Sequence, residues 1–184
     1  MKTLRFAAGL ALILATVSTL SAEEVKSGIE VDGKIGPYRT VKVTGCEDGV
    51  EAGDSLCYTC KLGARPVAFI FAKTPNNTLA ELVKELDAVA EANADSKMAN
   101  VINFNGEVTD EYLQQIKEFG EKLDLKHTAL TTSADGGKFK VNEDAEVTVM
   151  HYKGKKVSYN FASKDAISED EVKQIVKGAS TIVD

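Results

Sequence analysis

The sequence predicts an α/β domain whose sheet is partly parallel and partly antiparallel. A dense apolar run at residues 65–72 is followed by a turn and by an amphipathic helix that opens at Thr78. A second strand pattern at 99–105 is again followed by a helix, which Thr109 caps. Two strand-like runs within 146–161 are joined by a short glycine-containing turn, which indicates a hairpin. Two βα units and a hairpin therefore predict a parallel sheet with an antiparallel extension.

The run at 65–72 is expected to be the central strand. After Arg65 every residue in it is apolar, which is typical of a strand buried on both faces. Thr78 and Glu81 have the spacing of a capping box, so we expect the next helix to begin there. A third short strand is expected at 127–131.

The last helix should begin at Ser168. Ser168 and Glu171 form another capping box, and the apolar side chains that follow recur at spacings of three and four. These side chains are Val172, Ile175, Val176 and Ala179.

The first 22 residues have the order of a secretory signal peptide. Lys2 and Arg5 precede an apolar stretch, and small residues follow it. The apolar stretch is shorter than the roughly 20 residues of a spanning helix, so we expect no membrane anchor after cleavage. The sequence thus predicts a secreted or periplasmic protein in three parts: a signal peptide at 1–22, an N-terminal arm with a cysteine-containing loop at 23–63, and the main domain at 64–184.

The charge of the chain disfavours nucleic acid as a partner. The net charge is -6, and cleavage of a signal peptide with two basic residues would make it -8. An acidic chain gains little from the phosphate backbone, and no helical face combines Lys and Arg with aromatic residues. The composition does not exclude a protein partner, and the sequence does not identify one.

The segment before the central strand is expected to lie on the domain. Residues 23–36 are polar and rich in glycine, whereas 38–44 alternate apolar and polar as an edge strand would. The composition of 45–63 predicts a loop, and this loop holds all three cysteines.

The order of these elements resembles the thioredoxin-like fold. The turn that begins at Tyr152 and the final helix after Ser168 match its C-terminal part, and residues 28–38 are similar to the lead-in of redoxin and peroxiredoxin domains. The resemblance implies a catalytic cysteine in the turn after the central strand, where this chain has residues 74–77. It also implies a proline at the entry to the hairpin, where this chain has 144–146 without proline. The usual active-site cysteine is therefore absent.

The sharpest chemical feature is the pair Cys57 and Cys60. Two intervening residues allow a small disulfide ring to close and open, and nearby Lys61 and Arg65 could favour a thiolate. No helix start is evident beside the pair, and it precedes the central strand, whereas sites in open α/β sheets form beyond the carboxyl ends. The preferred disulfide joins Cys57 to Cys60 and leaves Cys46 as a free thiol. The sequence also permits a disulfide between Cys46 and either of the other two cysteines.

Two further interpretations use the same cysteines. Cys46, Cys57 and Cys60 with His127 or His151 would make a zinc set, but nothing in the sequence brings either histidine near. The pair followed by Lys61 also approximates a haem attachment motif in which lysine replaces histidine. We expect neither a metal nor a cofactor.

The sequence leaves two functions. The preferred one is a non-catalytic binding or scaffold role, in which the Cys57–Cys60 disulfide pins its loop to the sheet. The alternative is thiol–disulfide exchange, with Cys57 as the attacking thiolate, Cys60 as the resolving thiol and Lys61 favouring the thiolate.

Overall fold

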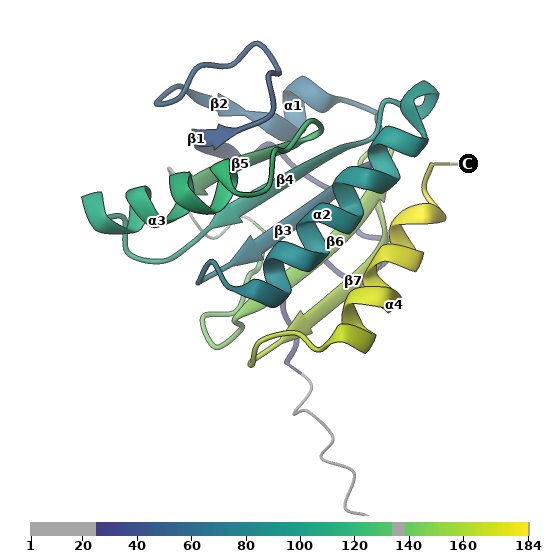
Figure 1. The fold of residues 1–184 in the computed structure, drawn as a ribbon. Helices are drawn as coiled ribbons and strands as arrows, with labels where there is room; N and C mark the ends of the chain where they lie inside the picture. Colours follow the sequence, from purple (N-terminus) through teal and green to yellow (C-terminus); the bar gives the residue numbers. More distant parts are fainter. Residues whose placement is uncertain (1–24, 134–138, 184) are drawn as a thin grey trace, which may run out of the picture.

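The structure, a computed structural model, describes residues 25–133 and 139–183. Its strands form one seven-stranded sheet with the order β2-β1-β5-β4-β3-β6-β7 (Figure 1). The strands are β1 (Arg39–Gly45), β2 (Ser55–Cys57), β3 (Val67–Ala72), β4 (Ala99–Phe104), β5 (Thr128–Ser133), β6 (Val147–Lys153) and β7 (Lys156–Ser163). The helices are α1 (Tyr58–Leu62), α2 (Asn77–Ala92), the 3-10 helix η1 (Ala94–Ser96), α3 (Asp110–Glu121) and α4 (Glu169–Ser180).

The centre of the sheet confirms the predicted α/β architecture. Strand β3 pairs in parallel with β4 and antiparallel with β6, and β4 pairs in parallel with β5. All six residues of β3 are buried, because helices cover one face and the N-terminal arm covers the other. Strands β6 and β7 form the predicted antiparallel hairpin.

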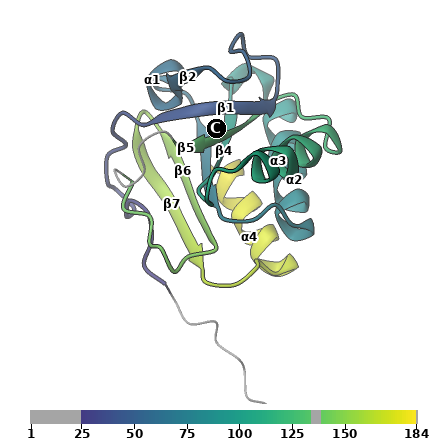
Figure 2. The same cartoon turned by 90° about the vertical axis from the view of Figure 1, so that its left-hand side faces the viewer.

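The two faces of the sheet bury separate cores. Helices α2, α3 and α4 cover one face, and the arm lies across the opposite face with α1 (Figure 2). The second core is rich in aromatic rings, and Tyr38 of the arm meets Phe69, Phe71 and Phe139 edge-on there. Edge-to-face contacts of this kind add to the hydrophobic stabilisation from burial. The arm therefore lies on the domain, as expected, and the structure adds that its side chains Ile35 and Tyr38 belong to the second core.

Three sequence-based expectations for local structure are wrong. Strand β1 is not an edge strand, because β2 pairs with its outer side. The segment 45–63 is not all loop, since it contains both β2 and α1. The cap of α2 is Asn76, whose side-chain oxygen accepts a hydrogen bond from the Leu79 amide at 2.9 Å, rather than Thr78.

The other predicted caps are confirmed. The Thr109 side chain accepts from the Tyr112 amide at the start of α3. Ser168 and Glu171 form a complete capping box at the start of α4.

The proposed signal peptide lies outside the described residues. Among the residues that are described, no helix combines the length and the apolar character needed to cross a bilayer. The division between an arm at 23–63 and a domain at 64–184 stays a prediction, although strands from both parts share one sheet.

Candidate functional site

Cys57 and Cys60 form a disulfide at the junction of β2 and α1. The sulfur atoms are 2.09 Å apart and the two Cα atoms 5.2 Å apart. Cys57 ends β2 and is also the N-cap of α1, and its Sγ accepts a hydrogen bond from the Cys60 amide at 3.1 Å. The expectation that no helix begins beside the pair is therefore wrong. A helix of five residues is too short to leave a periodic pattern in the sequence.

The disulfide faces solvent while its helix is anchored beneath it. Tyr58, Thr59 and Leu62 are buried, and the rings and methyl groups of Tyr58 and Leu62 join the second core. Cys57 is half-buried and Cys60 is exposed. One sulfur of the pair thus belongs to a side chain that an incoming molecule can reach.

The hydroxyl of Thr59 links the disulfide to the arm. Its oxygen lies 3.3 Å from the Sγ of Cys57 and donates to the Gly36 carbonyl at 3.0 Å. The same oxygen accepts from the Tyr38 amide at 3.2 Å. A hydroxyl has a single proton, so it can donate either to the carbonyl or to the sulfur.

A partly buried ion pair lies behind the helix. The Lys42 ammonium is 2.7 Å from one carboxylate oxygen of Asp48, and the Tyr58 hydroxyl donates to the other at 2.7 Å. Burial opposes the charge of Asp48, but the hydrogen bonds from Lys42 and Tyr58 outweigh it and hold the pKa of Asp48 below its ordinary value. Burial and the adjacent Asp48 carboxylate raise the pKa of Tyr58, so its hydroxyl stays a donor. This network fixes the side chain that follows Cys57.

Cys46 is the free cysteine, as expected. Its side chain is buried and its carbonyl accepts a hydrogen bond from the Lys42 ammonium at 2.7 Å. Burial, together with the nearby charge of Asp48, raises the pKa of the Cys46 thiol to about 11. A thiol with that pKa is protonated and unreactive near neutral pH.

Lys61 follows the disulfide on the exposed side of α1, and Arg65 lies in the loop after it. Lys61 is in the last turn of this short helix, so its side chain and Cys60 both belong to the solvent-facing part of α1. The structure thus brings the three predicted site residues, Cys57, Cys60 and Lys61, to one surface.

Polar contacts build the turn at 74–77, where the resemblance found in the sequence implies a cysteine. Asn76 caps α2 there, and the Tyr112 hydroxyl donates to the Lys73 carbonyl and accepts from the Gly106 amide. The Lys73 ammonium donates to the Glu143 carbonyl near the entry to β6. This turn follows the last residue of β3, whereas the disulfide precedes the first, as the sequence predicted.

The histidines do not join the cysteines. The Nε2 of His127 is 2.9 Å from a Glu91 carboxylate oxygen at the surface. His151 is fully buried and stacks on Tyr159, with ring centroids 4.9 Å apart. Among residues 25–133 and 139–183, no three side chains of the metal-ligating types are grouped. The structure therefore does not assemble the zinc set considered from sequence.

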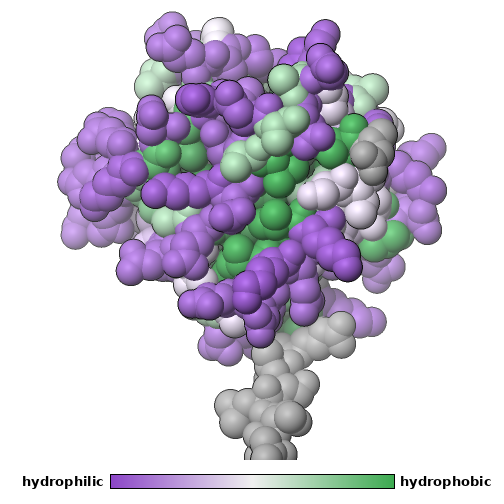
Figure 3. Space-filling view, turned by 45° about the vertical axis from the view of Figure 1, so that its right-hand side comes forward, coloured by the Kyte–Doolittle hydropathy of each residue, from purple (hydrophilic) through white to green (hydrophobic). Residues whose placement is uncertain are grey.

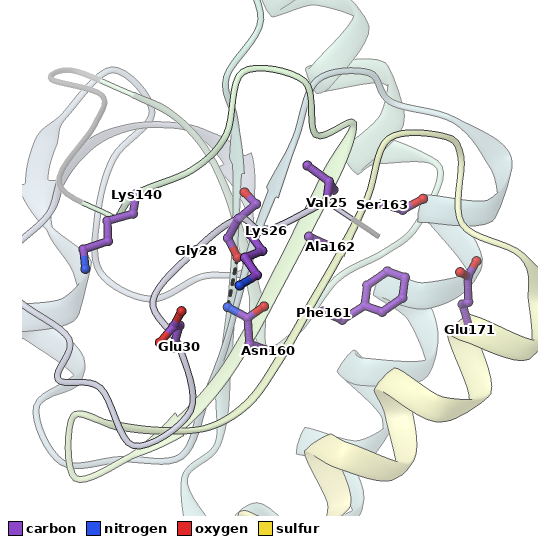
Figure 4. A pocket seen from close by; sticks show the side chains of 11 residues that line it. Val25, Lys26, Gly28, Glu30, Lys140, Asn160, Phe161, Ala162, Ser163 and Glu171 are labelled. Atoms are coloured by element: carbon purple, nitrogen blue, oxygen red, sulfur yellow. Dashed lines mark hydrogen bonds between the residues drawn. The ribbon is translucent and has the colours of Figure 1, made fainter. Parts of the chain in front are cut away.

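Two hollows on the surface lie away from the disulfide. A cavity of about 540 Å³ separates the arm from β7, and Asn160 crosses it to hydrogen-bond the Ser27 carbonyl at 3.0 Å (Figure 4). A groove between α2 and α4 has Val172 and Val176 among its lining residues. Figure 3 shows green, hydrophobic residues between purple, hydrophilic ones in a view turned toward this side of the molecule. No cysteine lines either hollow.

The mixed sheet and its flanking helices form a thioredoxin-like fold, and the Cys57–Cys60 disulfide precedes its central strand. No protein-family model and no curated protein match the chain. Among solved structures, peroxidoxin BcpB of Mycobacterium tuberculosis is similar, with a TM-score of 0.58 and 12% identity over 84% of this chain and 98% of that one. A secreted disulfide oxidoreductase of the same organism, homologous to E. coli DsbE, has a TM-score of 0.53 and 18% identity over 76% of this chain and 94% of its own.

A eukaryotic structure extends the comparison. The reduced 2-Cys peroxiredoxin of Plasmodium vivax has a TM-score of 0.54 and 14% identity, over 82% of this chain and 96% of its own. Identities this low show a shared fold, and the function has to be argued from the residues themselves.

Proposed function

We propose that this protein is an exported thiol–disulfide oxidoreductase whose reactive group is the Cys57–Cys60 pair. The observation that supports the proposal is the position of Cys57 at the N-cap of α1, where its Sγ accepts the Cys60 amide. A helix start and a hydrogen bond to sulfur both favour a thiolate. Cys57 is thus the sulfur that best carries the negative charge when the disulfide opens.

The exchange proceeds in two steps. A substrate thiolate attacks the exposed Cys60 sulfur, which forms a mixed disulfide and breaks the Cys57–Cys60 bond. The bonding electron pair leaves with Cys57 as a thiolate. A second substrate thiolate then attacks the substrate sulfur of the mixed disulfide and releases Cys60 as a thiolate. The substrate dithiol is oxidised, the protein disulfide is reduced by two electrons, and a low-molecular-weight disulfide re-oxidises it.

These roles modify the assignment made from sequence. Cys57 acts as the resolving thiol and not as the first nucleophile, because its thiolate displaces the substrate from Cys60 when the pair closes again. Cys60, rather than Cys57, carries the mixed disulfide, since its side chain is the exposed one.

The small size of the ring supports a redox role over a purely structural one. A disulfide stabilises a protein mainly by restricting the unfolded chain, and a ring of four residues gives only about 2 kcal/mol on the loop-entropy model. The ring also sits at the sheet margin, next to the three-residue strand β2. Its contribution to holding the fold together is therefore modest.

A non-catalytic binding role is the second candidate. It is favoured by the turn at 74–77, which has no cysteine, and by the entry to β6, which has no proline. In that case the disulfide only stiffens the junction of β2 and α1.

Turnover of a peptide dithiol distinguishes the two candidates. The oxidised protein, supplied with glutathione disulfide, should oxidise the peptide faster than glutathione disulfide alone does. Cys57→Ser and Cys60→Ser should both abolish this acceleration. Cys46→Ala, a matched control that removes the buried thiol, should retain it. A wild-type protein that gives no acceleration while folded would leave only the binding role.

Export is tested at the N-terminus of the mature protein. We expect a chain recovered from outside the cytoplasm to begin at Ala22 or Glu23, as cleavage after Ser21 or Ala22 requires. A chain that still begins at Met1 would contradict export.

A further inference from the structure

Three distant segments meet around the disulfide and form a surface that we call the disulfide rim. The rim consists of residues 34–39 of the arm and β1, residues 57–65 around α1, and the turn 153–156 between β6 and β7. The first two are joined by the hydrogen bond from the Thr59 hydroxyl to the Gly36 carbonyl. They are also joined by pairing of Arg39 with Cys57 in the β1–β2 ladder. Side chains that are paired across a ladder lie on the same face.

The hairpin turn completes the rim through two backbone hydrogen bonds. The Gly154 amide donates to the Ala64 carbonyl at 3.1 Å, which ties the turn to the loop after α1. The Ile35 amide donates to the Lys155 carbonyl at 2.8 Å, which ties it to the arm. The disulfide therefore opens onto a continuous surface that these three segments build together.

The rim is strongly basic in an acidic protein. The chain has 22 basic and 28 acidic side chains, and seven of the basic ones but none of the acidic ones lie in the rim. All seven are exposed. Six of them are Lys34, Arg39, Lys61, Arg65, Lys153 and Lys155. The seventh, Lys156, forms an ion pair of 2.7 Å with Asp32 at the margin of the rim.

We infer that the disulfide rim docks acidic polypeptide segments and so selects cysteine pairs flanked by Asp and Glu. This inference rests on the proposed function, because the exposed Cys60 lies within the rim. A concentrated positive field steers an acidic partner to the sulfur and repels a basic one. The rest of the acidic protein surface repels the same partner, so binding is confined to the rim.

A polypeptide is favoured over other anions by the chemistry at the centre of the rim. Thiol–disulfide exchange requires a sulfur in the bound molecule, and a protein segment with cysteines supplies both sulfur and carboxylates. A phospholipid surface or a nucleic acid offers the negative charge without the reacting group.

The test uses two peptides that contain the same cysteine pair, one flanked by Glu and the other by Lys. At low salt we expect the oxidised protein to react about tenfold faster with the acidic peptide, and the difference should shrink at 0.5 M NaCl. Lys34→Glu with Lys155→Glu, at two exposed rim positions that take no part in the thiol chemistry, should remove the preference. The control Lys84→Glu with Lys117→Glu makes the same charge change at exposed positions on α2 and α3 and should preserve it. Dithiothreitol attacks through a thiolate but has no flanking carboxylates, so its rate should differ much less between the two variants than the rate of the acidic peptide does.

Binding without chemistry separates this inference from the proposed function. In serine versions of both peptides, measured by fluorescence anisotropy, the acidic peptide should bind more tightly, and only the rim variant should lose that binding. Equal binding of the two peptides, or equal loss in the rim and control variants, would overturn the inference. Stronger capture by phosphatidylglycerol vesicles than by the acidic peptide, lost in the rim variant, would also overturn it by assigning the rim to membranes. Failure of peptide oxidation alone would contradict only the proposed redox role.

Discussion

The hydroxyl oxygen of Thr59 lies 3.3 Å from the Sγ of Cys57 while its proton is directed to the Gly36 carbonyl. When the disulfide opens, Cys57 becomes a charged acceptor that competes for that proton. Hydrogen bonds to charged groups are stronger than those to neutral ones. Reduction should therefore turn the hydroxyl toward the sulfur and weaken the attachment of the arm.

Replacement of Thr59 tests this contact. In reduced protein that carries Cys60→Ser, Thr59→Val should lower the rate of Cys57 alkylation at pH 7 by up to about tenfold. The reason is that loss of a hydrogen bond to a charged group costs about 1.5 kcal/mol. Thr59→Ser, which retains the hydroxyl, should alkylate at nearly the wild-type rate. Equal rates in the Val and Ser variants would show that the hydroxyl does not support the thiolate.

Cys46 should not react in the native protein. Its buried thiol has a pKa near 11, so almost none of it is thiolate at pH 8. Mass spectrometry after treatment with iodoacetamide should find no modified cysteine without reductant, two after mild reduction, and three after reduction in guanidinium chloride. Rapid labelling of Cys46 in the folded, oxidised protein would contradict the burial of this side chain.

His151 should make stability depend on pH. Burial lowers the pKa of His151 to about 4, whereas the unfolded chain has a value near 6.5. Between these values the unfolded state binds more protons, so the free energy of unfolding falls as the pH drops from about 6.5 to 4. The loss should reach about 3 kcal/mol.

A variant isolates this contribution. In His151→Phe, which keeps an aromatic ring against Tyr159, denaturant titrations should show a shallower loss of stability across the same pH range. A wild-type protein with constant stability between pH 6.5 and 4 would contradict the buried, neutral histidine.

The elements that the sequence predicts well are those with long, regular patterns. Strand β3 is an unbroken apolar run, and Thr109 and Ser168 cap helices of twelve residues each, so each pattern has enough length to be distinctive. At α2 two capping residues compete. Asn76 prevails because it accepts from the Leu79 amide, which leaves Thr78 inside the helix.

For the candidate site, the sequence predicts the cysteine pair but not the elements that hold it. The spacing of Cys57 and Cys60 identifies the pair, but α1 is too short for periodicity and β2 has only three residues. Thr59 and Gly36 are 23 residues apart in the sequence, so no local sequence pattern predicts the hydrogen bond between them. The basic rim could not be predicted from the sequence either, because its segments are far apart along the chain. The hydrogen bond from the Gly154 amide to the Ala64 carbonyl brings two of them together in the folded protein.

The central claim is that Cys57 and Cys60 interconvert between dithiol and disulfide under physiological conditions. The most direct test is the reduction potential of the pair, measured by equilibration with glutathione buffers in a Cys46→Ala background. We predict a value between about -120 and -270 mV, the range of catalytic pairs. A value below about -300 mV is that of a structural disulfide and would contradict the account.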